Sequence, residues 1–169
     1  MLRNKRFFPS LFLLSAVIAG SAALALPEDR DAPMEIESDQ ADIDQKSQRT
    51  LFTGHVQVIQ GTFTLWADKV VVQYRHRKPY EITATGEPAR FRQLPEKGKP
   101  WVKGSGRRIV YRIHADDVIL SGKAELLQKG DSFRSDRIVY DRKKARLKAG
   151  TAAGGKKRVK VILQPDGKP

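Results

Sequence analysis

The sequence predicts an all-β protein, and three observations support this class. Apolar and polar residues alternate with a period of two in residues 55–58, 62–65, 89–92 and 158–161, which places apolar side chains on one face of each strand. Glycines recur between such segments with a spacing typical of turns between short antiparallel strands: Gly54, Gly61, Gly86, Gly104, Gly106, Gly122, Gly130 and Gly150. No segment after the N-terminal one shows the apolar stripe of a long helix.

An internal repeat supports a sheet built from similar units. Four segments share a small residue, a polar or charged pair and then an apolar or small residue: 38–41, 67–70, 106–109 and 135–138. Between them, three further segments begin with glycine, at 54–56, 86–88 and 122–124, and each is followed by a glutamine, at Gln60, Gln93 and Gln128. A unit of a few strands cannot bury its apolar face alone, so we expect stacked units to share one interior.

The first 25 residues have the three parts of a secretory signal peptide. Arg3, Lys5 and Arg6 give a positive start, residues 11–18 form an apolar stretch, and residues 23–25 match the small-x-small cleavage pattern. The alternative is a membrane anchor, but this stretch is shorter than the roughly 20 residues that span a bilayer. We therefore expect cleavage after Ala25 and a periplasmic location.

The mature chain is long enough for one domain with its own core. Residues 26–33 are charged and contain prolines, which predicts a flexible N-terminus, and residues 34–163 form the expected β-domain. Within it, residues 94–100 are interpreted as a surface loop. Residues 164–169 contain no apolar residue, so we expect a disordered tail.

Charge and cysteine content restrict the partners and the source of stability. The chain carries 32 basic and 19 acidic residues, and three of the basic residues lie in the first 25, so the mature chain keeps a net charge of +10. Such a field favours anionic partners, among them nucleic acid, anionic lipid or a phosphorylated glycolipid. The chain has no cysteine, so packing and hydrogen bonds alone must stabilise it.

The sequence contains no recognisable catalytic or metal-binding constellation. His55, His76 and His114 lie at unrelated positions without metal-ligand spacing. Asp116 and Asp117 are adjacent, and adjacent strand residues point to opposite faces, so a turn explains them better than an acid pair. We therefore predict no enzyme activity, no metal site and no cofactor.

The order and spacing of several motifs resemble the OstA-like family of periplasmic lipopolysaccharide-transport proteins. The resemblance covers nearly all of the mature chain and is loose beyond Ala149. It rests on Ile36–Gln40, Phe52–Val56, Gln60–Thr62, Ala67–Val72, Gly86–Phe91, Gly98–Pro100, Leu120–Gly122 and Gly130–Tyr140. It implies an antiparallel β-jelly roll, slightly twisted and open along one side, and a protein that carries lipopolysaccharide without catalysing a reaction.

The resemblance also implies partners. Protomers of that family join head to tail between an inner-membrane export complex (LptC-like) and an outer-membrane translocon (LptD-like), and the lipid A moiety of lipopolysaccharide moves along their joined interiors. Lipid-contacting positions of the family match Met34, Ile36 and Phe91 here. The first and last strands would be the free sheet edges that pair with neighbours; the candidate edge residues are Met34, Ile36, Val159, Val161 and Leu163.

Alternation gives the full set of candidate lipid-binding residues, although it does not say which contact lipid and which pack on each other. They are Met34, Ile36, Ile43, Phe52, Val56, Val58, Phe63, Leu65, Val70, Val72, Ile82, Phe91, Ile109, Tyr111, Val118, Leu120, Leu126 and Ile138. Without the resemblance, the same pattern fits a closed sandwich core equally well, as in a scaffolding β-protein of the envelope. A nucleic-acid-binding protein is less compatible, because the basic runs lack interleaved aromatic platforms.

Overall fold

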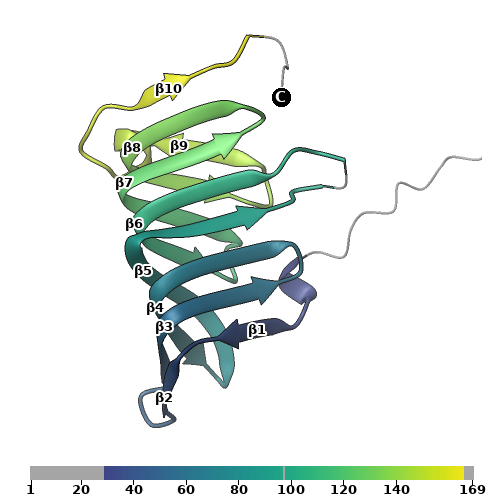
Figure 1. The fold of residues 1–169 in the computed structure, drawn as a ribbon, viewed down its shortest axis with the longest axis vertical. Helices are drawn as coiled ribbons and strands as arrows, with labels where there is room; N and C mark the ends of the chain where they lie inside the picture. Colours follow the sequence, from purple (N-terminus) through teal and green to yellow (C-terminus); the bar gives the residue numbers. More distant parts are fainter. Residues whose placement is uncertain (1–28, 97, 166–169) are drawn as a thin grey trace, which may run out of the picture.

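A computed structural model describes residues 29–96 and 98–165; the expected signal peptide and most of the expected tail lie outside these residues. The described chain forms one ten-stranded sheet (Figure 1) in which every pair of neighbouring strands is antiparallel. Six long strands follow one another as neighbours: β3 (Arg49–Gln60), β4 (Phe63–Arg75), β5 (Lys78–Gln93), β6 (Val102–Arg112), β7 (Asp117–Gln128) and β8 (Asp131–Asp141). A short 3-10 helix, η1 (Asp29–Asp31), precedes them.

Four short strands occupy the two ends of the sheet. β1 (Met34–Glu37) and β2 (Gln40–Asp44) pair with different halves of β3. At the opposite end, β9 (Arg146–Ala149) and β10 (Lys160–Ile162) pair with different halves of β8. The 3-10 helix η2 (Gly150–Ala153) separates them. Each end of the sheet therefore has two edge strands.

Every long strand bends near its middle, and the bends fold the sheet into two layers. Register shifts mark five of the bends, between Thr53 and Val56, Trp66 and Lys69, Thr85 and Ala89, Ser105 and Arg108, and Ser121 and Ala124. Bulges of this kind increase local twist and turn a strand out of its plane. We call the layer that contains β1 and β10 layer A, and the layer that contains β2 and β9 layer B.

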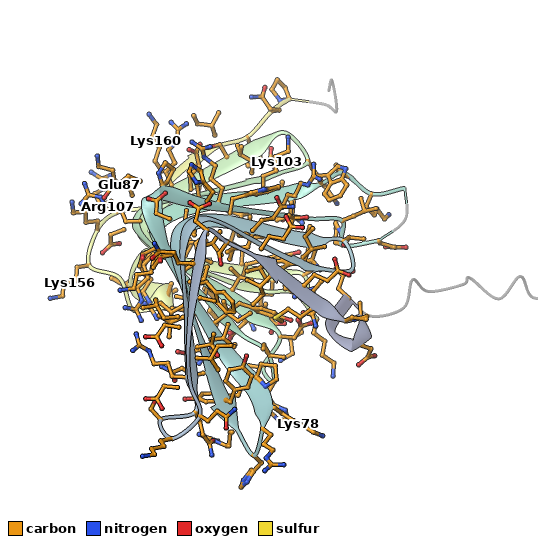
Figure 2. The ribbon with its side chains drawn as sticks, turned by 60° about the horizontal axis from the view of Figure 1, so that its bottom comes forward. Lys78, Glu87, Lys103, Arg107, Lys156 and Lys160 are labelled. Atoms are coloured by element: carbon orange, nitrogen blue, oxygen red, sulfur yellow. The ribbon has the colours of Figure 1, made fainter. Side chains whose placement is uncertain are left out.

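The bends form a corner along one long side, and the opposite side is the mouth between the layers. In Figure 2, Glu87 and Arg107 lie at the corner, Lys103 lies on layer A, and Lys78 lies at the far tip of layer B. Arg107 Nε is 3.5 Å from Glu87 Oε2, so this ion pair joins two neighbouring bends. This two-layer arrangement agrees with the predicted open β-jelly roll.

The repeated sequence motifs lie at this corner. The bulges contain Ala67-Asp68 in β4 and Gly106-Arg107 in β6, and the three glycine-led motifs supply the bends of β3, β5 and β7. The expectation of short strands separated by glycine turns is thus wrong, because these strands have 11 to 16 residues and several glycines lie inside them. Gly54 illustrates the reason: its φ is +79°, and a Cβ atom there would overlap the Asp39 carboxylate.

Candidate lipid-binding interior

The inward-facing apolar residues of both layers form one continuous cluster. Most of the candidate lipid-binding residues belong to it and are at most 2% exposed: Val56, Val58, Phe63, Leu65, Val70, Val72, Ile82, Phe91, Ile109, Tyr111, Val118, Leu120, Leu126 and Ile138. The rings of Phe63, Phe91 and Tyr111 meet at its centre, with centroid distances of 5.6 Å and 5.1 Å from Phe63. In this conformation the protein's own side chains fill the interior.

The remaining candidates lie at the N-terminal end of the sheet. Met34, Ile36 and Phe52 are half-buried and pack against the apolar cluster. Ile43 differs, because it lies on the edge strand β2 and is 67% exposed. Ile43 and Phe52 line a cavity of about 730 Å³ together with Tyr74. The apolar interior is therefore more accessible at this end than at its centre.

The C-terminal end presents a second exposed apolar strand. Val159, Val161 and Leu163 are 40%, 45% and 67% exposed, respectively. β10 pairs with β8 along only three residues, and Gln164 N–H donates to Asp131 Oδ1 at 3.0 Å just beyond it. The candidate edge residues thus lie at the two opposite ends of layer A.

A polar cluster at the mouth links the two layers. Arg142, in the turn after β8, donates from Nε to Gln93 Oε1 at 2.9 Å and from Nη2 to Asp29 Oδ2 at 3.3 Å. Its side chain is only 3% exposed, and its guanidinium lies 5.0 Å from the ring centroids of both Phe63 and Tyr111. A buried cation needs such partners, because desolvation is otherwise costly. Burial also raises the pKa of the nearby Tyr111 hydroxyl to about 12.

Sequence reasoning missed this cluster. Arg142 belongs to a charged run that is typical of an exposed turn, and Asp29 falls in the segment 26–33 that was expected to be flexible. From Asp29 onward that segment forms η1 and is hydrogen-bonded to the sheet. The recurring glutamine of the sequence repeat was the signal that could have indicated this cluster, because Gln60 and Gln93 both lie at the mouth. Gln60 Nε2 donates to the Ala32 carbonyl at 3.2 Å.

In the part of the chain that the structure describes, the histidines do not form a metal site with other side chains. His55 lies in the bend of β3, where its Nδ1 is 2.8 Å from Asp39 Oδ2, and this hydrogen bond raises its pKa. Among residues 29–96 and 98–165 no group of three or more acidic or histidine side chains is arranged to hold a metal ion.

In the same residues no helix is long and apolar enough to cross a membrane.

The folded sheet and its shared apolar interior define a β-jelly roll whose ends carry exposed edge strands. A family model described as the LptA/(LptD N-terminal domain) LPS transport protein matches residues 35–146. The chain therefore belongs to this family of lipopolysaccharide-transport proteins, which confirms the resemblance inferred from its motifs.

Individual relatives agree with this assignment. The chain is 32% identical to the lipopolysaccharide export system protein LptH of Pseudomonas aeruginosa over 93% of each chain. It is 38% identical to the lipopolysaccharide export system protein LptA of Escherichia coli K12, over 92% of this chain and 84% of the relative. The crystal structure of the Pseudomonas LptH, described as a periplasmic component of the lipopolysaccharide transport device, superposes with a TM-score of 0.76 at 29% identity. That match covers 82% of this chain and all of the LptH chain, and it confirms the predicted fold class.

Proposed function

We propose that this protein is a non-enzymatic carrier that shelters the acyl chains of lipopolysaccharide and passes them across the periplasm from the inner to the outer membrane. The observation that carries the proposal is a continuous apolar interior, shared by two layers whose strands run from one layer into the other along one side, in a member of this transport family. The proposed location requires export by the signal peptide in residues 1–25.

The hydrophobic effect explains why such a carrier is needed. Each methylene moved from water to an apolar environment gains about 0.8 kcal/mol, so an acyl chain of about a dozen carbons costs on the order of 10 kcal/mol to expose. A glycolipid with several chains therefore requires a continuous shelter between the membranes. A two-layered sheet provides one, because its apolar faces hold the chains while the mouth lets the bulky sugars remain in water.

The filled interior determines how cargo must enter. Since the central side chains are already packed on each other, the acyl chains have to displace them or separate the layers. The corner can act as a hinge for this separation, because the layers are covalently continuous there and meet through side chains elsewhere. Entry is expected to start at the N-terminal end, where Met34, Ile36 and Phe52 are only half-buried.

The sheet ends suit joining to neighbours by strand addition. β1 and β10 are the edge strands of layer A, and a neighbouring chain that pairs with either would extend the sheet and its apolar face. We propose head-to-tail pairing of this protein with itself, with an LptC-like inner-membrane component at one end and an LptD-like outer-membrane component at the other. Joined interiors would then offer a path without a break.

Site-specific crosslinking in cells tests the carrier function. A photoreactive amino acid at Ile36, which faces the interior, is expected to crosslink to lipopolysaccharide, whereas one at the exposed Glu35 is not. The two positions are adjacent on β1 and differ in the face they occupy, so they control for expression and local structure. Equal labelling of both positions, or none at either, would contradict the proposal.

A closed-core scaffold remains the second candidate because the interior is filled in this conformation. A scaffold would bind envelope proteins but no glycolipid. Purification of the mature protein from cells, followed by analysis of bound lipid, separates the two: a carrier is recovered with lipopolysaccharide and a scaffold is not.

A further inference from the structure

The polar cluster at the mouth contains a set of hydrogen-bond donors that surround one anion. The carboxylate of Asp29 accepts from Thr62 N–H at 2.8 Å, Thr62 Oγ1 at 2.7 Å, Gln93 Nε2 at 3.0 Å and Arg142 Nη2 at 3.3 Å. Thr62 and Gln93 belong to layer A, and Arg142 to layer B. We call these three residues the anion cradle.

The cradle is defined by the sheet and not by the segment that occupies it. Thr62 lies in the turn between β3 and β4, and it is held in place because Leu94 N–H donates to its Oγ1 at 3.2 Å. Gln93 ends β5 and is 7% exposed. Arg142 is additionally positioned by the Asp116 carboxylate, whose Oδ1 is 3.3 Å from Nη1. These donors would keep their places if Asp29 left.

Asp29, in contrast, comes from a segment that lies outside the strands of the sheet. It lies in the three-residue helix η1, before the first strand of the sheet. Gln60 Nε2 also donates to the Ala32 carbonyl, just after this helix, at 3.2 Å. A short segment outside the strands can open locally at a lower free energy than the sheet, so the Asp29 carboxylate can leave while the donors stay in place.

Two buried polar atoms in this region make no hydrogen bond within the described part of the chain. One is Arg142 Nη1, which is paired with Asp116 Oδ1 at 3.3 Å by charge alone, and the other is the Tyr140 hydroxyl on β8. Burial raises the pKa of the Tyr140 hydroxyl, and the positive charge of Arg142 partly offsets this rise. A phosphate monoester has three terminal oxygens where a carboxylate has two, and it binds guanidinium groups strongly.

The cradle also borders the apolar interior. The Arg142 guanidinium lies over the rings of Phe63 and Tyr111, and both rings belong to the central cluster. An amphiphile with its phosphate in the cradle would have its acyl chains directed along these rings, and its sugars would emerge at the mouth.

We propose that Thr62, Gln93 and Arg142 form a binding site for the phosphate group of a phosphorylated glycolipid, and that Asp29 occupies this site as an internal substitute when no cargo is bound. Cargo phosphate displaces Asp29, which releases η1 from the mouth. The glycolipid identity of the ligand rests on the proposed function, whereas the anion cradle itself does not.

The first test asks whether the cradle binds phosphate without any lipid. Asp29→Ala should empty the cradle, so inorganic phosphate should raise the Tm of this variant by several degrees relative to chloride at matched ionic strength. The wild type should respond much less, because Asp29 competes. Asp42→Ala is the matched control, since it removes one acidic charge from an exposed position on β2. Asp29→Asn replaces Asp29→Ala if the latter does not fold.

Two outcomes of this first test overturn the cradle. One is an equal response of the Asp29→Ala and Asp42→Ala variants to phosphate, which would indicate a general effect of charge. The other is an unchanged response when Gln93→Ala is added to Asp29→Ala, because that double variant lacks one donor of the site and should lose most of the stabilisation.

The second test identifies the source of the phosphate. Binding of bisphosphorylated lipid A and of dephosphorylated lipid A is compared in the wild type and Asp29→Ala. We expect Asp29→Ala to bind the phosphorylated form about tenfold more tightly than the wild type, a change of roughly 1.4 kcal/mol, with no change for the dephosphorylated form. An equal change for both forms would overturn the assignment to a glycolipid phosphate. If neither form binds any variant, the carrier function fails, and the inorganic phosphate test still decides the cradle.

Discussion

The ring of Phe91 in β5 lies against Gly104 of its neighbour β6, so closely that a Cβ atom on this glycine would overlap the ring. The two residues are direct partners in the antiparallel register, and both are buried. The missing side chain of Gly104 therefore creates the space in which Phe91 stacks on Phe63. The packing at the centre of the interior therefore depends on an aromatic residue paired with a glycine.

Gly104→Ala is expected to destabilise the protein by about 1–3 kcal/mol, because an added methyl group forces the Phe91 ring out of its position. Ser105→Ala is the matched control: it lies next to Gly104 but faces away from the interior, and it should change stability by less than about 0.5 kcal/mol. Chemical denaturation measures both. A Gly104→Ala variant as stable as the wild type would show that the ring has room to move.

Proline substitution in β10 tests strand addition. The N–H groups of adjacent strand residues point to opposite sides of the strand. Proline removes this N–H, so one of the two variants Lys160→Pro and Val161→Pro loses a donor that faces β8. The other variant loses a donor on the free edge of the sheet. The edge-directed variant is expected to stay folded and to lose concentration-dependent assembly in light scattering. Val161→Thr keeps the N–H and the β-branched shape and should assemble normally. Normal assembly of both proline variants would rule out β10 as the joining edge.

The buried Tyr111 hydroxyl predicts a specific alkaline dependence of stability. Its pKa of about 12 in the folded protein exceeds the value of about 10 in the unfolded chain, so the folded state favours the protonated form. This contribution is present below about pH 10 and is lost as the pH rises toward 12. Between pH 10 and pH 12 the unfolding free energy of the wild type should therefore fall by roughly 1–3 kcal/mol more than that of Tyr111→Phe. A constant difference would show that the hydroxyl ionises normally.

His55 and Asp39 connect the bend of β3 to the corner between β1 and β2, and their interaction can be followed by NMR. The hydrogen bond to Asp39 raises the pKa of His55 above 6.5. Its contribution to stability is thus present below the unfolded pKa and is lost as the pH rises through the folded one. Asp39→Asn should lower the pKa of His55, whereas Glu37→Gln, an equal change of charge on β1, should alter it less. Both side chains are exposed, so the effect on stability is expected to be small.

The sequence predicted the interior better than it predicted the strands. Alternation identified the buried apolar residues correctly, because inward and outward positions follow from the backbone alone. It placed Ile43 among them, yet Ile43 is exposed because β2 is an edge strand with a partner on one side only. A period-two pattern reports the face of a strand and does not report what lies opposite that face.

The sequence around a glycine did not show whether that glycine lies in a turn or inside a strand, and the reason is physical. Gly61 lies in a turn between strands, whereas Gly106 lies in a bulge within β6, and both have a polar residue on either side. The difference is set by pairing with distant strands, which local sequence does not encode. Arg142 shows the same limit, because its burial depends on Asp29, 113 residues earlier in the chain.

The bends recur at equivalent positions in successive strands, so each hairpin of the sheet has nearly the same cross-section as the next. Duplication or loss of one hairpin would alter the length of the molecule while its profile stayed constant. A scaffold of this kind allows evolution, or a designer, to set the span of a single subunit in whole-hairpin steps.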